Sequence, residues 1–363
     1  MKYWLGYLTA GIIMACTWAL REFAKAHSAL VDMIYPYVIR MAQVFLADWS
    51  SSVDFCVWQM LLLVMIALVI GIIVLIIIFK WNPIRWLGWI CAAVAVVIFL
   101  HTGLYGLNQF SGPLSEDIRL EETEFIIDEL EKATIYYRNE ANALATLVER
   151  NSAGNVKFAE FDRLAEQAVT GFEKLVYEES LSVFAGPMDP VKELGWSKFF
   201  TKRGITGVTV GLTGEAAVNP QTPDVMMPFA ICREMARRAS ITIAEDASFA
   251  ATYACKINDD VQFRYSGALM SYRYCLEMLD SLDRVTGTNT AAEVAAGENA
   301  QLDHDLKICN KFYGTNARKD ANTCDLLTSW HIQEVVLPLQ VEEESPFDPL
   351  DKSQVDLDDH PNA

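Results

Sequence analysis

The chain has 363 residues, 52% of them hydrophobic, and yet it carries a formal net charge of −18. Its mean hydropathy of +0.18 is too high for a typical soluble acidic protein, and its charge is too large for an ordinary polytopic transporter. The acidity also argues against a nucleic-acid partner, because a phosphate backbone binds to basic surfaces.

The charge separates the chain into two unlike parts at Phe110. Residues 1–110 hold six basic and four acidic residues, whereas the remainder holds 23 basic and 43 acidic ones. We therefore expect a membrane region over residues 1–110 and an extracytoplasmic domain over residues 111–340, long enough for its own core. Residues 341–363 are rich in acids and proline, which predicts a disordered acidic tail.

Two uncharged runs, at residues 57–79 and 86–107, predict transmembrane helices joined as a hairpin. The short connection carries Lys80 and Arg85, so the positive-inside rule places it in the cytoplasm. The domain that follows the hairpin then lies outside the cytoplasm, on a multi-pass protein of the cell membrane.

Residues 3–20 are also apolar and form a candidate third span. The alternative is a secretory signal, because Lys2 precedes the run and a small-x-small cleavage pattern follows at residues 24–26. The length of the run favours retention. The stretch that continues to Leu46 is amphipathic and could lie along the membrane interface.

The soluble part has apolar residues at helical spacing over most of its length. Residues 204–219 differ, since they are rich in Thr, Val and Gly and predict one or two short strands. The expected fold class is a membrane-anchored, mainly α protein with two to three transmembrane helices and a helix-rich α+β soluble domain with a small sheet. Helices are expected at residues 125–150, 157–179, 227–240, 244–257, 260–283 and 299–313.

Common catalytic signatures are missing from the sequence. There is no glycine-rich phosphate loop and no G-x-S-x-G nucleophile elbow. Among the five histidines, His101 falls in or at the end of a predicted span and His360 falls in the tail. A site built from several histidines in the soluble domain is therefore nearly excluded.

Several motifs nevertheless resemble a bacterial membrane-anchored domain family of unknown function whose members look like zinc metallopeptidases. The resemblance runs from the predicted spans to about residue 340 and implies a zincin-like soluble domain. The motifs are PLSEDI at 113–118, YYRNEANAL at 136–144, TGEAAVN at 213–219, MPFAICREMARR at 227–238, AEDASF at 244–249 and FRYSGALMSYRYC at 263–275.

The chain departs from that family at the metal-binding motif. Where the family has His-Glu-x-x-His, this sequence has Arg233, Glu234 and Arg237. In the intact motif two imidazoles bind zinc and the glutamate acts as general base. Arginine cannot replace the histidines, because its guanidinium stays protonated and offers no lone pair. The resemblance thus implies a pocket that has lost its zinc and kept Glu234 as a vestigial base.

The family's third metal ligand falls on Asp246, with Glu245 beside it. We expect Arg233 or Arg237 to take the place of the metal and to pair with Asp246, Glu245 or Glu234, because a buried carboxylate needs a counter-charge. The alternative is that an Arg-Glu-x-x-Arg pattern forms an ordinary ion-pair face on the helix surface.

Further residues are candidates for the same pocket. A tyrosine or arginine of the 263–275 motif could support an oxyanion, although packing and ion pairs are the more frequent roles. The two residues of the TGEAAVN motif could border a substrate cleft or belong to a hairpin turn. These candidates are Glu215, Asn219, Arg264, Tyr265, Tyr272 and Arg273.

The patterns together favour an inactive zinc-metallopeptidase-like membrane protein that acts as a binding or regulatory module and holds no metal. A peptide or protein ligand could add to a strand edge at residues 211–219. Two alternatives stay open: an active peptidase that holds its metal through carboxylates, and a structural envelope protein. Pairing of Cys309 with Cys324 in an oxidising exterior also stays open.

Overall fold

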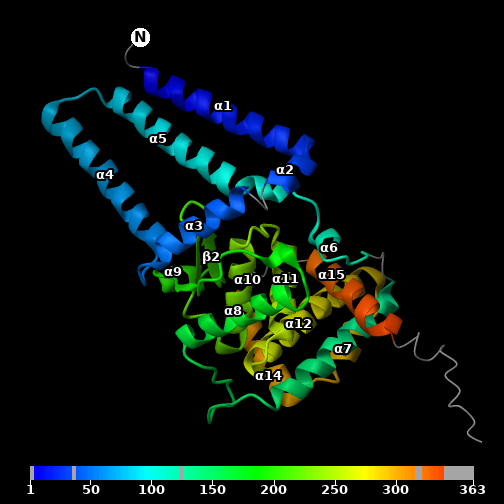
Figure 1. Cartoon of the computed structure of the whole chain (residues 1–363). Coiled ribbons are helices and arrows are strands. Elements are labelled where there is room, and N and C mark those ends of the chain that lie inside the picture. The colour runs from blue at the N-terminus through cyan, green and yellow to red at the C-terminus, as the bar shows by residue number, and fades with distance from the viewer. Residues whose placement is uncertain (1–3, 35–37, 123–125, 315–320, 339–363) are drawn as a thin grey trace, which may run out of the picture.

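The computed structural model describes residues 4–34, 38–122, 126–314 and 321–338. Three long helices extend to one side of a helical globular body (Figure 1). They are α1 (Leu5–Ala26), α4 (Val57–Phe79) and α5 (Pro83–Leu104). The predicted acidic tail at residues 341–363 lies outside the described residues.

Both α4 and α5 are long and apolar enough to span a membrane. Helix α4 has the predicted bounds, whereas α5 begins three residues earlier than predicted, at Pro83. Proline suits the first turn of a helix, where its missing N–H is not needed. Asn82 caps the same turn, because its Oδ1 accepts hydrogen bonds from the backbone N–H groups of Ile84 and Arg85.

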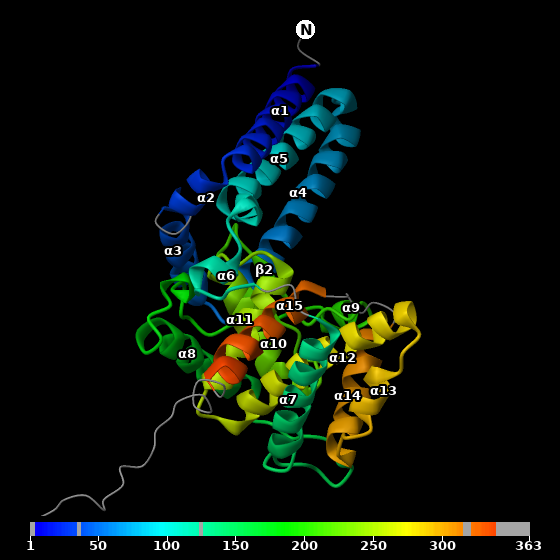
Figure 2. The ribbon, with the colours of Figure 1, turned by 90° about the vertical axis from the view of Figure 1, so that its right-hand side faces the viewer.

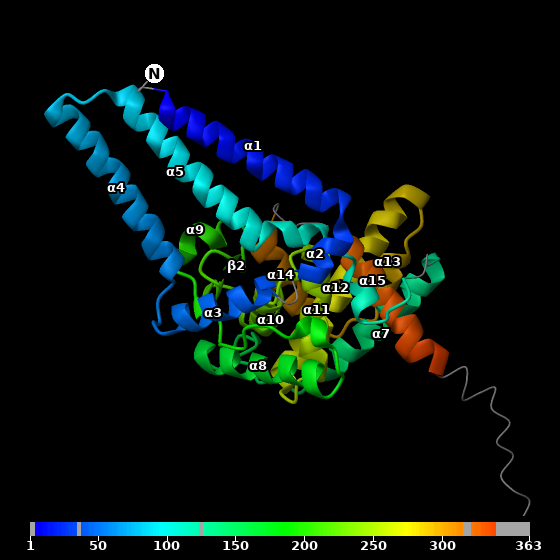
Figure 3. The same ribbon diagram turned by 45° about the horizontal axis from the view of Figure 1, so that its top comes forward.

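Helix α1 packs lengthwise against α5 (Figures 1 and 3). The two backbones approach closely, since a Cβ on Gly6 would lie 2.5 Å from the backbone carbonyl carbon of Gly88. Of the described helices, only α4 and α5 meet the length and hydropathy of a span. Two of the expected spans are therefore long and apolar enough to cross a membrane. The possible third span, at residues 3–20, stays a prediction.

Helix α3 joins the long helices to the body instead of standing apart from it. It packs on the turn at residues 211–214, where a Cβ on Gly214 would lie 2.6 Å from the backbone nitrogen of Ala47. Gln43 Nε2 donates to the backbone oxygens of Leu104 and Gly211, at 2.8 and 2.9 Å. The bounds of these connecting helices are α2 (Ser28–Ile34), α3 (Arg40–Ser51) and the 3-10 helix η2 (Gly106–Phe110).

The body is built mainly of helices, and each helix expected there is present. Helix α11 has the predicted bounds, whereas α6, α9, α13 and α15 were not predicted. Helices α7, α13 and α14 lie against α12, and α13 and α14 also contact α7 (Figure 2). The bounds are α6 (Leu114–Asp117), α7 (Ile127–Ala145), α8 (Phe161–Tyr177), α9 (Ser197–Thr201), α10 (Met227–Arg238), α11 (Ala244–Ile257), α12 (Val261–Thr286), α13 (Thr290–Ala295), α14 (Ala300–Tyr313) and α15 (Ala321–His331).

A small mixed sheet of three strands lies beside α10. The expected strand pair is present as an antiparallel hairpin of β2 (Gly207–Val210) and β3 (Glu215–Val218), and β1 (Lys192–Glu193) pairs with β3 in parallel. The strand order is β1-β3-β2, so β3 is central and pairs on both sides. Strand β2 pairs with all four residues of β3, whereas β1 pairs only with Ala217 and Val218. The expectation of a peptide or protein ligand at a strand edge in residues 211–219 stays a prediction.

All eight cysteines lie in the described part of the chain, and each is a free thiol. Cys324 of α15 is hydrogen-bonded to Cys275 of α12. Cys309 is buried on α14. Cys309 and Cys324 therefore do not form a disulfide in this structure; both are buried free thiols.

Candidate functional site

The Arg-Glu-x-x-Arg motif lies on α10, which the body buries almost completely. Glu234 is 1% exposed and Arg233 is 9% exposed, so the surface ion-pair alternative does not hold for either residue. Strand β2 crosses directly beside Glu234. A Cβ at Gly207 would lie 2.4 Å from Glu234 Cγ, so the glycine makes room for the glutamate.

Two neighbours hold the carboxylate of Glu234. Thr209 Oγ1 donates to Glu234 Oε2 at 2.8 Å, and Arg237 Nη1 lies 3.3 Å from Oε1. The expected pairing of one motif arginine with Glu234 is therefore present, and it is made by Arg237. The charge-assisted hydrogen bond from Arg237 holds this carboxylate in place.

The motif lines a cavity of about 600 Å³ between the body and the end of α5. Four arginines and one carboxylate, Glu234, lie among its lining residues, and we call it the arginine cavity. His101 and Tyr105 reach it from the last turn and the C-cap of α5. Its other charged or aromatic lining residues are Arg203, Arg233, Arg237, Arg273, Tyr274 and Tyr313.

Arg273 is the one predicted candidate of α12 that lines this cavity. It is 4% exposed and forms an ion pair with Glu277. Its guanidinium carbon lies 4.6 Å from the ring centroid of Tyr313, and its Nε donates to Asn310 Oδ1 at 3.3 Å. Burial raises the pKa of the Tyr313 phenol, while Arg233 and Arg273 nearby lower it.

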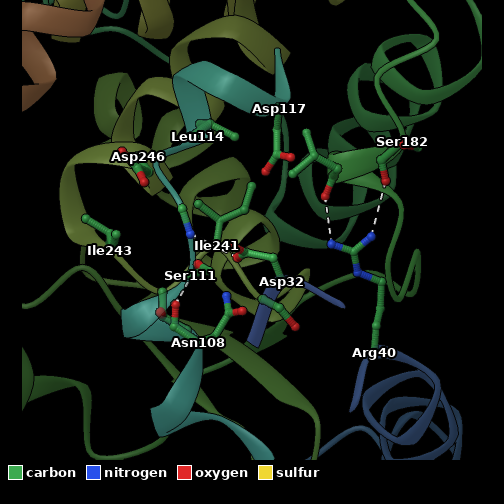
Figure 4. Close-up of a pocket in the computed structure, with 14 residues that line it drawn as sticks. Asp32, Arg40, Asn108, Ser111, Leu114, Asp117, Ser182, Ile241, Ile243 and Asp246 are labelled. Atoms are coloured by element: carbon green, nitrogen blue, oxygen red, sulfur yellow. Dashed lines mark hydrogen bonds between the residues drawn. The ribbon is translucent and has the colours of Figure 1, made fainter. Parts of the chain in front are cut away.

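Asp246, the expected third ligand position, lines a different cavity of about 300 Å³ (Figure 4). Asp32 and Asp117 also line this second cavity, which we call the acidic cavity. The carboxylate of Asp246 accepts a hydrogen bond from the backbone N–H of Leu114. The structure therefore does not assemble the ligand positions Arg233, Arg237 and Asp246 around one point.

The donor set does not fit zinc. Arg233 and Arg237 have no lone pair to offer, and among the described residues Glu234 is the only carboxylate that lines the arginine cavity. Across the part of the chain that the structure describes, no group of three or more His, Cys, Asp or Glu side chains could hold a metal ion. The backbone oxygen of Glu245 accepts a hydrogen bond from Thr323 Oγ1 at 3.3 Å.

Arg40 forms the wall of the acidic cavity on the side of α3 (Figure 4). Its guanidinium donates to the backbone oxygens of Ser182, Val183 and Ala239, at 3.2, 3.0 and 3.3 Å. Burial lowers the pKa of Arg40, and the charge of Asp117 raises it. Arg40 therefore fastens α3 to the body.

The pKa of Asp246 is raised to about 6: burial raises it most, the Leu114 N–H lowers it, and the nearby acids Glu245, Glu122 and Asp117 raise it. The folded state therefore holds this proton more tightly than the unfolded chain does. The contribution of Asp246 to the free energy of unfolding falls as pH rises from about 4 to about 6 and is level above that.

We expect Asp246→Asn to remove this loss of stability between about pH 4 and pH 6. The amide stays neutral, and its oxygen can still accept a hydrogen bond from the Leu114 N–H. The variant should exceed the wild type in stability above pH 6 by up to about 3 kcal/mol and match it near pH 3. Denaturant unfolding at several pH values measures the difference. Asp162→Asn, at an exposed carboxyl in the first turn of α8, is the control and should follow the wild-type profile. Coincident profiles for Asp246→Asn and the wild type would contradict the prediction.

The other predicted candidates have structural partners away from the arginine cavity. Glu215 lies on β3, and its carboxylate accepts from the first backbone N–H groups of α4. Asn219 Nδ2 donates to Thr201 Oγ1 and to the Ile205 backbone oxygen. Arg264 is exposed and lines a separate crevice. The hydroxyls of the two buried tyrosines donate to carboxylates, with O–O distances of 2.5 Å for Tyr265 and Asp305 and 2.7 Å for Tyr272 and Glu298.

Sequence reasoning missed several residues of the two cavities. Arg203 follows α9, Tyr105 ends α5 and Tyr313 ends α14, so only the tertiary fold brings them to α10. Asp32 and Arg40 belong to the segment that we expected at the membrane interface. No motif marks these residues in the sequence.

The fold and the cavities define a mainly helical protein with a small mixed sheet and two helices long and apolar enough to cross a membrane. The chain belongs to the family described as "Protein of unknown function (DUF3810)", whose profile matches residues 31–324. The match extends from α2 to the start of α15 and includes both cavities. No curated protein and no solved structure matches the chain.

Proposed function

We propose that this protein is an inactive relative of zinc metallopeptidases, anchored in the cell membrane with its body outside the cytoplasm. It serves as a binding or regulatory module, and the arginine cavity is its ligand site. The observation that carries the proposal is the ion pair of Arg237 with Glu234, formed where the family it resembles would hold a metal and its general base.

Electrostatics supports the loss of the metal. Two guanidinium groups at the ligand positions would repel a dication, since like charges a few ångströms apart interact unfavourably in a partly buried site. Arg237 also supplies the counter-charge that Glu234 needs when it is buried. The pocket is therefore stable without a metal ion.

The two alternatives receive less support. A peptidase that binds its metal through carboxylates would need Glu234 and Asp246 in one site, but they line different cavities. A purely structural envelope protein would have a filled pocket, but the arginine cavity has a volume of about 600 Å³.

The experiment is element analysis of the full-length protein purified in detergent, together with a peptidase assay. We expect no stoichiometric zinc and no hydrolysis in the wild type. The double variant Arg233→His and Arg237→His restores two imidazoles, and its zinc content should rise above that of the wild type, because the two repelling charges are gone. Arg284→His, at an exposed position of α12, controls for zinc bound by any added histidine. Stoichiometric zinc with peptide hydrolysis in the wild type would refute the proposal.

A further inference from the structure

The arginine cavity concentrates positive charge in a protein whose net charge is −18. Its arginines come from three segments: Arg203 after α9, Arg233 and Arg237 on α10, and Arg273 on α12. Glu234 is the only carboxylate among its lining residues, and Glu277, which pairs with Arg273, is not one of them. Even with Glu277 counted, the site keeps an excess of positive charge.

We propose that this cavity binds a phosphate group, carried either by a lipid headgroup or by a soluble phosphate compound. The inference names the ligand chemistry of the proposed binding module and rests on that proposed function.

Two buried donors in the cavity have no partner in the described structure. Arg237 contacts Glu234 through Nη1, but its buried Nε has no hydrogen-bond acceptor. The buried hydroxyl of Thr242, which also lines the cavity, has none either. Buried polar groups in proteins are nearly always hydrogen-bonded, so such donors indicate an acceptor that comes from outside the chain.

Phosphate fits this donor set better than a carboxylate does. A guanidinium group forms a planar fork that matches either anion. A phosphate monoester carries up to two negative charges and three acceptor oxygens, so several forks and a hydroxyl can contact it at once. A carboxylate has one charge and two oxygens, which would leave part of the arginine excess unbalanced.

The position of the cavity gives a membrane lipid direct access to it. His101 and Tyr105 come from the last turn and the C-cap of α5, which reaches the body next to α10 and β2 (Figure 1). If α5 spans a bilayer, its end lies at the depth of the headgroups. Arg203 is exposed at this site, with its guanidinium carbon 3.8 Å from the ring centroid of Phe199.

The test uses the full-length protein in maltoside micelles, which contain no phosphate. One arm titrates inorganic phosphate against chloride at equal ionic strength. The other arm adds short-chain phosphatidic acid, with diacylglycerol as the control that lacks the phosphate group. We expect saturable binding in at least one arm, followed by thermal shift and calorimetry. Binding of inorganic phosphate alone identifies a soluble source, and binding of phosphatidic acid alone identifies a lipid.

The variants Arg203→Gln and Arg237→Gln should each weaken binding roughly tenfold, because each removes a charge-assisted contact. Arg284→Gln is the matched control, since it removes an exposed arginine that pairs with Asp280 on the same helix as Arg273. Arg203→Gln keeps the test valid even if loss of the Arg237 pair prevents folding, because Arg203 is exposed.

The inference is overturned if neither phosphate ligand binds, or if both variants bind as tightly as the wild type. Saturable binding of a peptide carboxylate without a response to phosphate would also overturn it, in favour of a protein partner. These outcomes differ from a failure of the proposed function. That failure would appear as stoichiometric zinc and peptide hydrolysis, whether or not the protein binds phosphate.

Discussion

Asp305→Asn is expected to destabilise the body by about 3 kcal/mol, because it removes one member of a buried ion pair. Asp305 is 0% exposed on α14, and its carboxylate accepts from three donors. Arg150 Nη1 and Nη2 lie 3.1 and 2.7 Å from the two carboxylate oxygens, and the Tyr265 hydroxyl lies 2.5 Å from Oδ2. The amide would leave the guanidinium without a counter-charge and one donor without an acceptor. Denaturant unfolding of the detergent-solubilised protein measures the loss.

Helix α14 supplies a matched control for this prediction. Asp303 pairs with Lys307 at 2.6 Å, but the Lys307 side chain is largely exposed and the Asp303 side chain is about half exposed. Exposed pairs contribute little, so Asp303→Asn should change the free energy of unfolding by less than about 0.5 kcal/mol. Equal effects of the two substitutions would show that the Arg150–Asp305–Tyr265 network does not stabilise the body as its burial implies.

Glu215→Gln is expected to loosen the junction between α4 and the body and to lower stability by about 2–4 kcal/mol. The Glu215 carboxylate accepts from the backbone N–H groups of Val57 and Trp58, both at 2.8 Å, and from Lys192 Nζ at 2.8 Å. The first N–H groups of a helix have no partner within the helix, and the partial positive charge there favours an anion. The amide would keep one N–H contact and lose the charge that Lys192 needs.

Hydrogen exchange at the first turn of α4 reports this change directly, and we expect faster exchange of the Val57 and Trp58 amides. Glu193→Gln is the control, since Glu193 neighbours Lys192 on β1 and its side chain is exposed. The double variant Glu215→Gln with Lys192→Met should recover part of the loss, because no uncompensated charge remains. Unchanged amide exchange in Glu215→Gln would argue that other contacts hold the junction.

The sequence predicts the helices of this protein well, because helical periodicity and uncharged length are local properties. Helices α4 and α11 have the predicted bounds, and the β2–β3 hairpin lies within the predicted strand segment. The order of the three strands could not be predicted. Strand β1 is two residues long and pairs with β3 only through a long-range contact, so its sequence carries no periodic signal.

The candidate site was predicted only in part, for a physical reason. Spacing along a helix shows which residues share a face, but it does not show what packs against that face. Arg233, Glu234, Arg237 and Arg273 line the arginine cavity, whereas Asp246 lines another cavity. Tyr265 donates to Asp305 of α14, and Tyr272 donates to Glu298, which precedes α14. Only the tertiary fold brings these acids near the tyrosines.

The cap that Glu215 places on α4 also determines how the body moves. Lys192 Nζ contacts Glu215 and the backbone oxygens of Ser50 and Phe55, while Gln43 bridges the ends of α5 and β2. The body is therefore fixed to the α4–α5 helix pair at several points, not joined to it by a flexible linker alone. If α4 and α5 tilt to match the thickness of a bilayer, the body would tilt with them. The tilt would then set the height of the arginine cavity above the lipid surface.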